Sequence, residues 1–447
     1  MRRLVPLAIA LATLAGCSLE EASAPADTVR VVIGYQSKTI NTVTAGTLLR
    51  AQGYLEKRLD EITARGGAKY QVEWQDYDTG APITAQMVAE KIDIGSMGDY
   101  PVLINGSRTQ ANERARTELV SVTGYNPRGG LNHIVVKPDS TIGSVKELAG
   151  KKVSSSVGSA SDGLLRQALE RNGVDPKSGA EVLNQQPQVG ASALESGQVS
   201  ALSQFVAWPG LLVFQNKAKL LYDGAELNVP TFHGVVARKD YTAKHPEVLD
   251  AFLRAQLDAT TFIHEKPLEA AKIVADGSGL PQEVVYLYNG PGGTAFDLTL
   301  KPSLVNALKG DVAYLKSIGD FAELNIDTFV NDTHVRKVVG TDYDRQLAAT
   351  ENPTPGTGIE AWFDGTRTQQ FQTVAELLAA VKGKPVRAAY VPDTELGTRW
   401  YADKSVWVRD GEKFLPFSTP AGAARYTGAH PGAVTVSYQQ AVTEVRP

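Results

Sequence analysis

Strands and helices alternate along the first 240 residues of this chain, and no other feature limits its fold as strongly. The run VRVVIGYQ, Val29–Gln36, is rich in β-branched residues and then meets a loop, which is typical of a buried strand. We expect a helix over Thr47–Thr63, a strand in YQVEWQD, a helix over Ala81–Glu90 and a strand in IDIGSMG. Strands that alternate with helices form βαβ units, so the sequence predicts an α/β fold with a mostly parallel sheet.

The same pattern then occurs a second time. NHIVVKPDS is a predicted strand, and GSASDGLLRQALERNG is a predicted helix that Gly173 ends. A further strand is expected over His233–Asp240. Beyond it the chain is mainly helical, with one helix starting at Pro246 and another over Lys301–Ile318. The sequence therefore predicts two α/β units followed by a helical segment.

The composition changes near residue 341. Residues 341–358 contain two prolines and two glycines after a charged run, so we interpret them as a linker. Residues 359–447 are a mixture of short strands and short helices. We expect them to form a separate small α+β domain with its own core.

The N-terminus has the plan of a secretory signal peptide. Arg2 and Arg3 precede the apolar run Leu4–Leu14, which is too short to span a bilayer, and LAGC follows with Cys17, the only cysteine in the chain. LAGC resembles the lipobox of bacterial lipoproteins, in which the cysteine is acylated after cleavage. We therefore expect a signal peptide over residues 1–16, a lipidated tether over residues 17–28, and a protein that Cys17 anchors in the lipid bilayer outside the cytoplasm.

Composition excludes several classes of function. The formal net charge is −4 and no Lys/Arg-rich run occurs, which argues against nucleic acid as a partner. With one cysteine in the chain, a mature protein has no disulfide and no thiolate metal site. The DTG of Asp78–Gly80 resembles an aspartic protease motif, but that chemistry needs two such aspartates and the chain has one DTG. We expect no enzymatic activity and no cofactor.

Four segments together resemble the solute-binding proteins of ABC importers for taurine, alkanesulfonates and nitrate. They are VVIGYQ, YDTGAPITAQMVAEKIDIGSMGDYPVLINGS, IGSVKELAGKKVSSSVGSASDGLLRQAL and GVVARKDYTAKHPEVLDAF. The resemblance runs from about Val29 to Val338. It implies a type II periplasmic-binding-protein fold, with lobe 1 over about residues 29–125 and 232–340, lobe 2 over about 126–231, and a hinge between them. It also implies a monomer that captures a small oxyanion, most simply an organosulfonate, and delivers it to an ABC permease.

The chemistry of the cleft predicts where an oxyanion binds. Helix N-termini present free backbone N–H groups and partial positive charge. Two such openings follow predicted strands, and we expect both to contact the ligand. They are GDYP, with Gly98, Asp99 and Tyr100, and VGSASDG, with Gly158, Ser159 and Ser161. The two serines have a second interpretation, in which they only cap their helix.

Four further assignments rest on the same resemblance. Gln36 at the end of the first strand and Trp208 at the cleft wall are expected ligand contacts, with a loop hydrogen bond and core packing as the alternatives. Asp99 either caps its helix or pairs with a cationic group of the ligand. His233 stands where taurine binders carry an acidic residue, which favours a sulfonate without an amine or another anion.

The C-terminal segment resembles a different family. Residues Ile359–Tyr438 are similar to the copper-carrying accessory lipoprotein of nitrous-oxide reductase. Cu(I) prefers Cys and Met ligands, yet no Met follows Met97 and no Cys follows Cys17. The resemblance therefore implies the fold without the metal site. The alternatives for the whole chain are a copper-handling lipoprotein, or a receptor for nitrate, bicarbonate or a pyrimidine.

Overall fold

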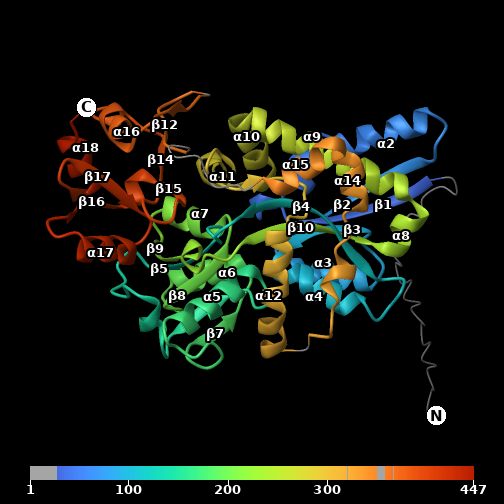
Figure 1. Cartoon of the computed structure of the whole chain (residues 1–447), viewed down its shortest axis with the longest axis horizontal. Helices are drawn as coiled ribbons and strands as arrows, with labels where there is room; N and C mark the ends of the chain where they lie inside the picture. Colours follow the sequence, from blue (N-terminus) through green and yellow to red (C-terminus); the bar gives the residue numbers. More distant parts are fainter. Residues whose placement is uncertain (1–27, 320, 350–357, 366, 447) are drawn as a thin grey trace, which may run out of the picture.

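The computed structural model describes residues 28–446 except 320, 350–357 and 366. Two α/β lobes lie side by side, and a C-terminal domain packs against both of them (Figure 1). The expected signal peptide and Cys17 lie outside the described residues, as do residues 350–357 of the expected linker.

Lobe 1 is built on a six-stranded sheet in the order β11-β4-β10-β3-β1-β2. β1 pairs in parallel with β2 and β3, whereas β10 runs antiparallel between β3 and β4. The sheet therefore combines strands from both ends of the body. Its strands are β1 Thr28–Tyr35, β2 Lys69–Asp76, β3 Ile94–Gly98, β4 Thr117–Asn126, β10 Thr231–Arg238 and β11 Ala295–Phe296.

Helices cover this sheet, and their apolar faces form most of the main core. The expected helix over Thr47–Thr63 is wrong in one respect. It is broken into α1 and α2 at Gly53, whose φ of +62° lies in the left-handed region that glycine tolerates. The helices are α1 Thr47–Ala51, α2 Tyr54–Ala64, α3 Gly80–Val88, α4 Asp99–Thr109, α8 Lys239–Lys244, α9 Pro246–Glu265, α10 Pro267–Ser278, α11 Gln282–Asn289, α12 Pro302–Ile318, α13 Ile326–Phe329, α14 Thr333–Val339 and α15 Tyr343–Ala348.

Lobe 2 is a five-stranded sheet in the order β7-β6-β8-β5-β9, covered by three helices. Its strands are β5 Asn132–Val136, β6 Lys152–Ser155, β7 Glu181–Asn184, β8 Ala201–Phe205 and β9 Lys219–Asp223. Its helices are α5 Ala160–Arg171, α6 Pro187–Glu195 and α7 Trp208–Phe214.

Two connections join the lobes. The chain leaves lobe 1 between Asn126 and Asn132 and returns between Asp223 and Thr231. This pair of crossings is the hinge of a periplasmic-binding-protein fold, as the sequence predicted. Ligands bind such open α/β sheets at the carboxyl ends of the strands, which in lobe 1 means the end of β3 at Gly98.

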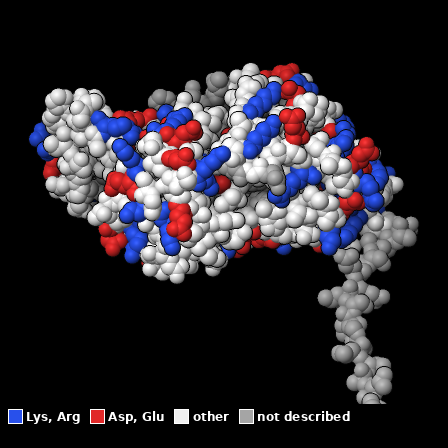
Figure 2. All heavy atoms as spheres, turned by 90° about the horizontal axis from the view of Figure 1, so that it is seen from below, with Lys and Arg blue, Asp and Glu red and all other residues white. Residues whose placement is uncertain are grey.

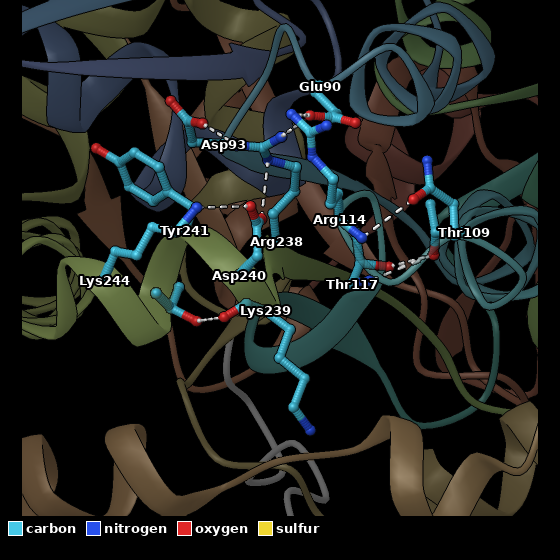
Figure 3. A network of polar contacts seen from close by, with 12 residues as sticks. Glu90, Asp93, Thr109, Arg114, Thr117, Arg238, Lys239, Asp240, Tyr241 and Lys244 are labelled. Carbon is cyan, nitrogen blue, oxygen red and sulfur yellow. Dashed lines mark hydrogen bonds and ion pairs between the residues drawn. The ribbon is translucent and has the colours of Figure 1, made fainter.

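A network of ion pairs fixes the opposite end of β10 (Figure 3). The buried guanidinium of Arg238 donates to Asp93 Oδ1 at 3.1 Å and lies within 4 Å of Glu90 and Asp240. Asp93 also accepts from the backbone of Val32 at 2.9 Å. Because three neighbouring strand segments share this network, it fixes the register of the lobe 1 sheet away from the cleft.

The C-terminal domain, residues 358–446, contains two small antiparallel sheets with orders β13-β12-β14-β15 and β17-β16-β18. Its strands are β12 Glu360–Trp362, β13 Gln369–Gln370, β14 Ala388–Pro392, β15 Arg399–Tyr401, β16 Val406–Asp410, β17 Lys413–Phe417 and β18 Val434–Val436. Its helices are α16 Val374–Val381, α17 Pro420–Ala429 and α18 Tyr438–Glu444.

Two expectations about this part of the chain are corrected. The expected linker begins with a 3-10 helix over residues 340–342 and with α15, because the ring of Tyr343 is buried. The C-terminal domain has apolar clusters of its own, but Trp362, Tyr390, Trp400 and Tyr401 belong to the main core of the lobes. The domain therefore shares its core with the two lobes.

The surface carries both signs of charge. Basic and acidic side chains are interspersed over the face in Figure 2, in keeping with the small net charge. Within the described residues, no helix is both long and apolar enough to cross a membrane.

Candidate ligand cleft

The interlobe cleft lies where the N-terminus of α4 in lobe 1 faces the N-terminus of α5 in lobe 2. The lobes are in contact here. Tyr100 of α4 accepts a hydrogen bond from Gln167 of α5 at 3.0 Å, and a Cβ on Gly158 would lie 3.2 Å from Ile104. The structure thus brings both predicted helix openings together across the cleft.

Gly98 and His233 form the lobe 1 side of the hinge. They are paired residues of β3 and β10, and a Cβ on Gly98 would lie 3.2 Å from His233 Nε2. A side chain at position 98 would therefore crowd the His233 ring, which would have to shift by a few tenths of an ångström. The Nδ1 atom of His233 lies 2.6 Å from the amide nitrogen of Asn41. Burial lowers the pKa of His233 to about 3, so the ring is neutral at physiological pH.

Asp99 is fixed to the hinge. Its Oδ2 accepts from Thr231 Oγ1 at 2.7 Å and from the backbone N–H of Phe232 at 3.3 Å, and its Oδ1 accepts from the N–H of Tyr100 at 2.8 Å. Desolvation nevertheless raises its pKa to about 6. These bonds make Asp99 the first residue of α4 and tie that helix to β10. A carboxylate at this helix opening also disfavours an anion there.

Tyr100 joins three helices. Its hydroxyl donates to Asp311 of α12 at 2.9 Å while it accepts from Gln167 of lobe 2. Burial raises the pKa of Asp311 well above its ordinary value, and the nearby carboxylate of Asp99 raises it further. No local pattern pointed to Asp311, because nothing in the nearby sequence relates α12 to α4.

The second helix opening is largely satisfied by its own residues. Gly158 has a φ of +82° and donates its N–H to Asp162 Oδ2 at 3.1 Å. The hydroxyls of Ser159 and Ser161 lie 2.8 Å apart, and both side chains are buried. Asp162 also pairs with Arg166, which offsets the negative charge of Asp162. A ligand at this opening would therefore contact mainly the backbone and the Ser159 hydroxyl.

Gln36 occupies the end of β1, as predicted. Its amide donates to the backbone oxygen of Ser96 at 3.1 Å, and its Oε1 accepts from Thr39 at 3.3 Å. These are the loop hydrogen bonds that the sequence left open as the alternative. Gln36 therefore joins β1 to β3 beside the cleft.

Trp208 begins α7 and faces lobe 1. The Nζ atom of Lys38 lies 6.0 Å from the centre of its indole ring, within the range of a cation–π contact. Among the described residues, Lys38 has no carboxylate partner. Sequence reasoning missed Lys38, although its place two residues after Gln36 was a usable signal.

A hollow of about 210 Å³ separates the lobes on the other side of the α4–α5 contact. Pro101, Ile104 and Arg108 line it from one face of α4, and Val157 and Gly158 line it from lobe 2. Arg108 is exposed and has no ion pair within the described part of the chain. It was also missed, although the three- and four-residue spacing of Pro101, Ile104 and Arg108 predicts a shared helix face.

The cleft offers positive charge and hydrogen-bond donors. Its two free cations and its hydroxyl and backbone donors suit an oxyanion, and the neutral His233 adds no charge. Across the described residues, no cluster of three or more His, Cys, Asp or Glu side chains is placed to hold a metal ion.

Sequence comparisons agree with this geometry. The family model described as NMT1/THI5 like matches residues 103–270. The taurine-binding periplasmic protein of Escherichia coli K12 is 26% identical over 230 residues, which are 51% of this chain and 68% of the relative. A putative aliphatic sulfonates-binding protein of the same organism is 25% identical over 316 residues, covering 70% and 92% of the two chains. Its counterpart in Bacillus subtilis 168 is 27% identical over 284 residues, covering 63% and 80%.

Solved structures show the same fold. The alkanesulfonate-binding protein SsuA of Xanthomonas axonopodis pv. citri, bound to MOPS, superposes with a TM-score of 0.58 at 21% identity over 70% of this chain and 100% of its own. The aliphatic sulphonate-binding protein SsuA of E. coli gives 0.54 at 23% identity, covering 67% and 97%. The two-lobe body of this chain therefore has the periplasmic-binding-protein fold, its residues 103–270 match the NMT1/THI5-like family model, and it is similar to taurine- and sulfonate-binding proteins.

Proposed function

We propose that this chain is the substrate-binding receptor of an ABC importer and that it holds a small organosulfonate between its lobes. The observation that carries the proposal is the pair of free cations, Lys38 and Arg108, on the two sides of the α4–α5 contact. Lys38 is half-buried, and a half-buried cation without a carboxylate partner costs free energy unless an anion completes it. Arg108 is exposed and adds a second positive charge that an anion can reach. The relatives that bind taurine and aliphatic sulfonates supply the ligand class.

The polar groups of the cleft favour a sulfonate that lacks an ammonium group. An ammonium group needs a free carboxylate, but Asp99 already accepts three hydrogen bonds from the hinge and from its own helix. His233 is neutral and contributes no negative charge. We therefore expect alkanesulfonates to bind more tightly than taurine, with nitrate, bicarbonate and pyrimidines as the competing ligands.

The same proposal includes an anchor and a partner. Acylation of Cys17 would hold the receptor on the outer face of a membrane, close to the permease that accepts the ligand. Ten residues, 18–27, lie between Cys17 and the start of β1 at Thr28, and we expect this short tether to keep the receptor near that permease.

A thermal-shift screen followed by calorimetry tests the ligand. A ligand at about 100 times its Kd adds about 2.7 kcal/mol to the free energy of unfolding. We expect ethanesulfonate or a longer alkanesulfonate to produce such a shift. A shift with nitrate, bicarbonate or a pyrimidine, and none with sulfonates, would contradict the ligand class.

Three variants then locate the site. Lys38→Ala and Arg108→Ala each remove a charge-assisted contact of about 1.5–3 kcal/mol, which weakens binding about 10- to 150-fold. Ser159→Asp keeps a good helix cap but places a negative charge beside the anion, so binding should be lost with little change in stability. Lys57→Ala is the matched control, because Lys57 is exposed on α2 away from the cleft. Unchanged affinity in all three variants would remove the site from this part of the cleft.

A further inference from the structure

The C-terminal domain is fixed to lobe 1 by a buried cluster around Arg399, whose Nε has no hydrogen-bond partner among the described residues. The guanidinium of Arg399 donates to Glu360 Oε2 at 2.7 Å and to the backbone oxygen of Pro291 at 2.7 Å. It lies 4.8 Å from the ring centre of Tyr286, which belongs to α11, and 4.4 Å from that of Tyr390, which belongs to β14. Arg399 and Glu360 are each only 1% exposed in their side chains. A charge pair this deeply buried is costly to break.

The same face has further contacts with α11. Arg387 pairs with Glu283 at 2.5 Å, and the Tyr390 hydroxyl donates to the backbone oxygen of Glu283 at 2.9 Å. The rings of Tyr286 and Trp362 meet edge to face at 6.0 Å. The C-terminal domain and α11 therefore form one packed unit.

A different set of contacts connects the domain to lobe 2. Tyr401 donates to the backbone oxygen of Gly210 in α7, and Ser418 donates to Asp223 at the end of β9. Arg425 pairs with Glu226 at 3.0 Å, in the connection that leads back to lobe 1. These contacts are polar, and most involve one hydrogen bond each.

The packing against lobe 2 is also incomplete. A pocket of about 430 Å³ in the C-terminal domain reaches this contact, where Phe214 of α7 lines it and the Phe214 ring centre lies 5.7 Å from that of Tyr401. Both ring nitrogens of the buried His133 in β5, and the indole N–H of the adjoining Trp400, have no hydrogen-bond partner among the described residues. Unpaired buried polar atoms weaken the contact that buries them.

We propose that the C-terminal domain is a clamp on the hinge: it stays on lobe 1 and holds lobe 2 in the closed arrangement by contacts that release when the lobes part. Rotation about the two hinge crossings changes the distance between α11 and α7, so the two sets of contacts cannot both persist in an open form. The lobe 2 set is the weaker of the two and yields first. This inference rests on the proposed function, because closure of the lobes matters only in a protein that binds a ligand between them.

Contacts made only in the closed form shift the equilibrium toward that form by their own free energy. The clamp should therefore raise the affinity for the ligand and slow its release, because more of the ligand-free protein is already in the closed form. Release of lobe 2 should increase the open fraction of the ligand-free protein severalfold. It should also speed ligand dissociation by at least about three-fold.

Pulsed electron spin resonance on the full chain tests the clamp without a ligand. Spin labels on Lys57→Cys in lobe 1 and Lys146→Cys in lobe 2, both exposed positions, report the distance between the lobes. Cys17→Ser removes the only native thiol. The release variant carries Tyr401→Phe, Ser418→Ala and Arg425→Ala, and the control carries Arg409→Ala, which breaks an exposed pair with Glu444 inside the C-terminal domain.

We expect one short interlobe distance in the parent and control proteins, and an added longer distance in the release variant. Identical distance distributions in parent and release variant would overturn the clamp. If the triple variant folds poorly in a urea titration, Lys404→Ala with Arg425→Ala loosens the same side through two side chains that are not buried. A chain that binds no sulfonate but still opens in the release variant would refute the proposed ligand and leave the clamp supported.

Discussion

Replacement of Gly163 by alanine should obstruct closure of the lobes without disturbing either lobe. Gly163 lies in the first turns of α5, and a Cβ there would be 2.2 Å from Cζ of Tyr100 across the cleft. Carbon atoms pack at about 3.5–4.0 Å, so ring and helix must separate by about 1.5 Å. That displacement takes the Tyr100 hydroxyl away from Asp311 or from Gln167, or from both.

The size of the effect follows from these contacts. A neutral hydrogen bond contributes about 1 kcal/mol and one to a charged group about 1.5–3 kcal/mol, whereas alanine in a helix gains about 0.5–1 kcal/mol over glycine. The closed form should lose about 2–3 kcal/mol, which weakens ligand binding about 30- to 150-fold. The free energy of unfolding should change less, because the lobes can part without either one unfolding.

Calorimetry with the tightest sulfonate measures the affinity, and urea unfolding measures the fold. Gly310→Ala is the matched control. Gly310 also lies within a helix, α12, but a Cβ there meets nothing within 4 Å, so that variant should bind normally. Equal affinities for Gly163→Ala and Gly310→Ala would refute the reasoning, because they would mean that Tyr100 and α5 do not meet in the liganded protein.

Three further outcomes are expected. Cys17→Ala should abolish incorporation of labelled palmitate, since the chain has no second thiol, and persistent labelling would contradict the anchor. Burial raises the pKa of Asp99 to about 6 from an ordinary 3.8. The contribution of protonated Asp99 to the free energy of unfolding is therefore full below about pH 4 and is lost as the pH rises through 6. In urea titrations at pH 4 and pH 7, Asp99→Asn should lose less stability over that range than the parent protein. The full chain carrying Cys17→Ser should lose Cu(I) to a chelating probe in a competition titration, because the C-terminal domain offers His430 and oxygen donors but no sulfur. Stoichiometric, chelator-resistant copper would support the copper-lipoprotein alternative.

The sequence was most informative where a function depends on local pattern. The strand that ends at Gln36 and the glycine before Asp99 were recognisable because alternation, glycine and a helix cap are all written within a few residues. The two α/β units followed from the order of those elements, whereas the hinge and its crossings were implied by the family resemblance. Gly53 shows the limit even of local pattern, since an apolar periodicity that continues past a glycine hides the break between α1 and α2.

The side-chain partners across the cleft were beyond local reasoning. Tyr100 meets Asp311 across 211 residues of sequence, and Lys38 meets Trp208 only because the lobes close. The same holds for the C-terminal domain. The proline- and glycine-rich segment that precedes this domain predicted a separate module, but aromatic residues such as Trp400 pack into the core of the lobes. Such packing depends on the shape of a distant surface, which no short stretch of sequence encodes.

The central position of β10 has a consequence for how the chain assembles. β10 lies between β3 and β4, and His233 pairs with Gly98 across more than a hundred residues, so the lobe 1 sheet stays in two parts until β10 has arrived. Lobe 2, by contrast, is one continuous stretch from Asn132 to Asp223. Local contacts form faster than distant ones. The chain can therefore complete its second lobe while the first is still open, and the surface that receives the last ninety or so residues is finished only after that.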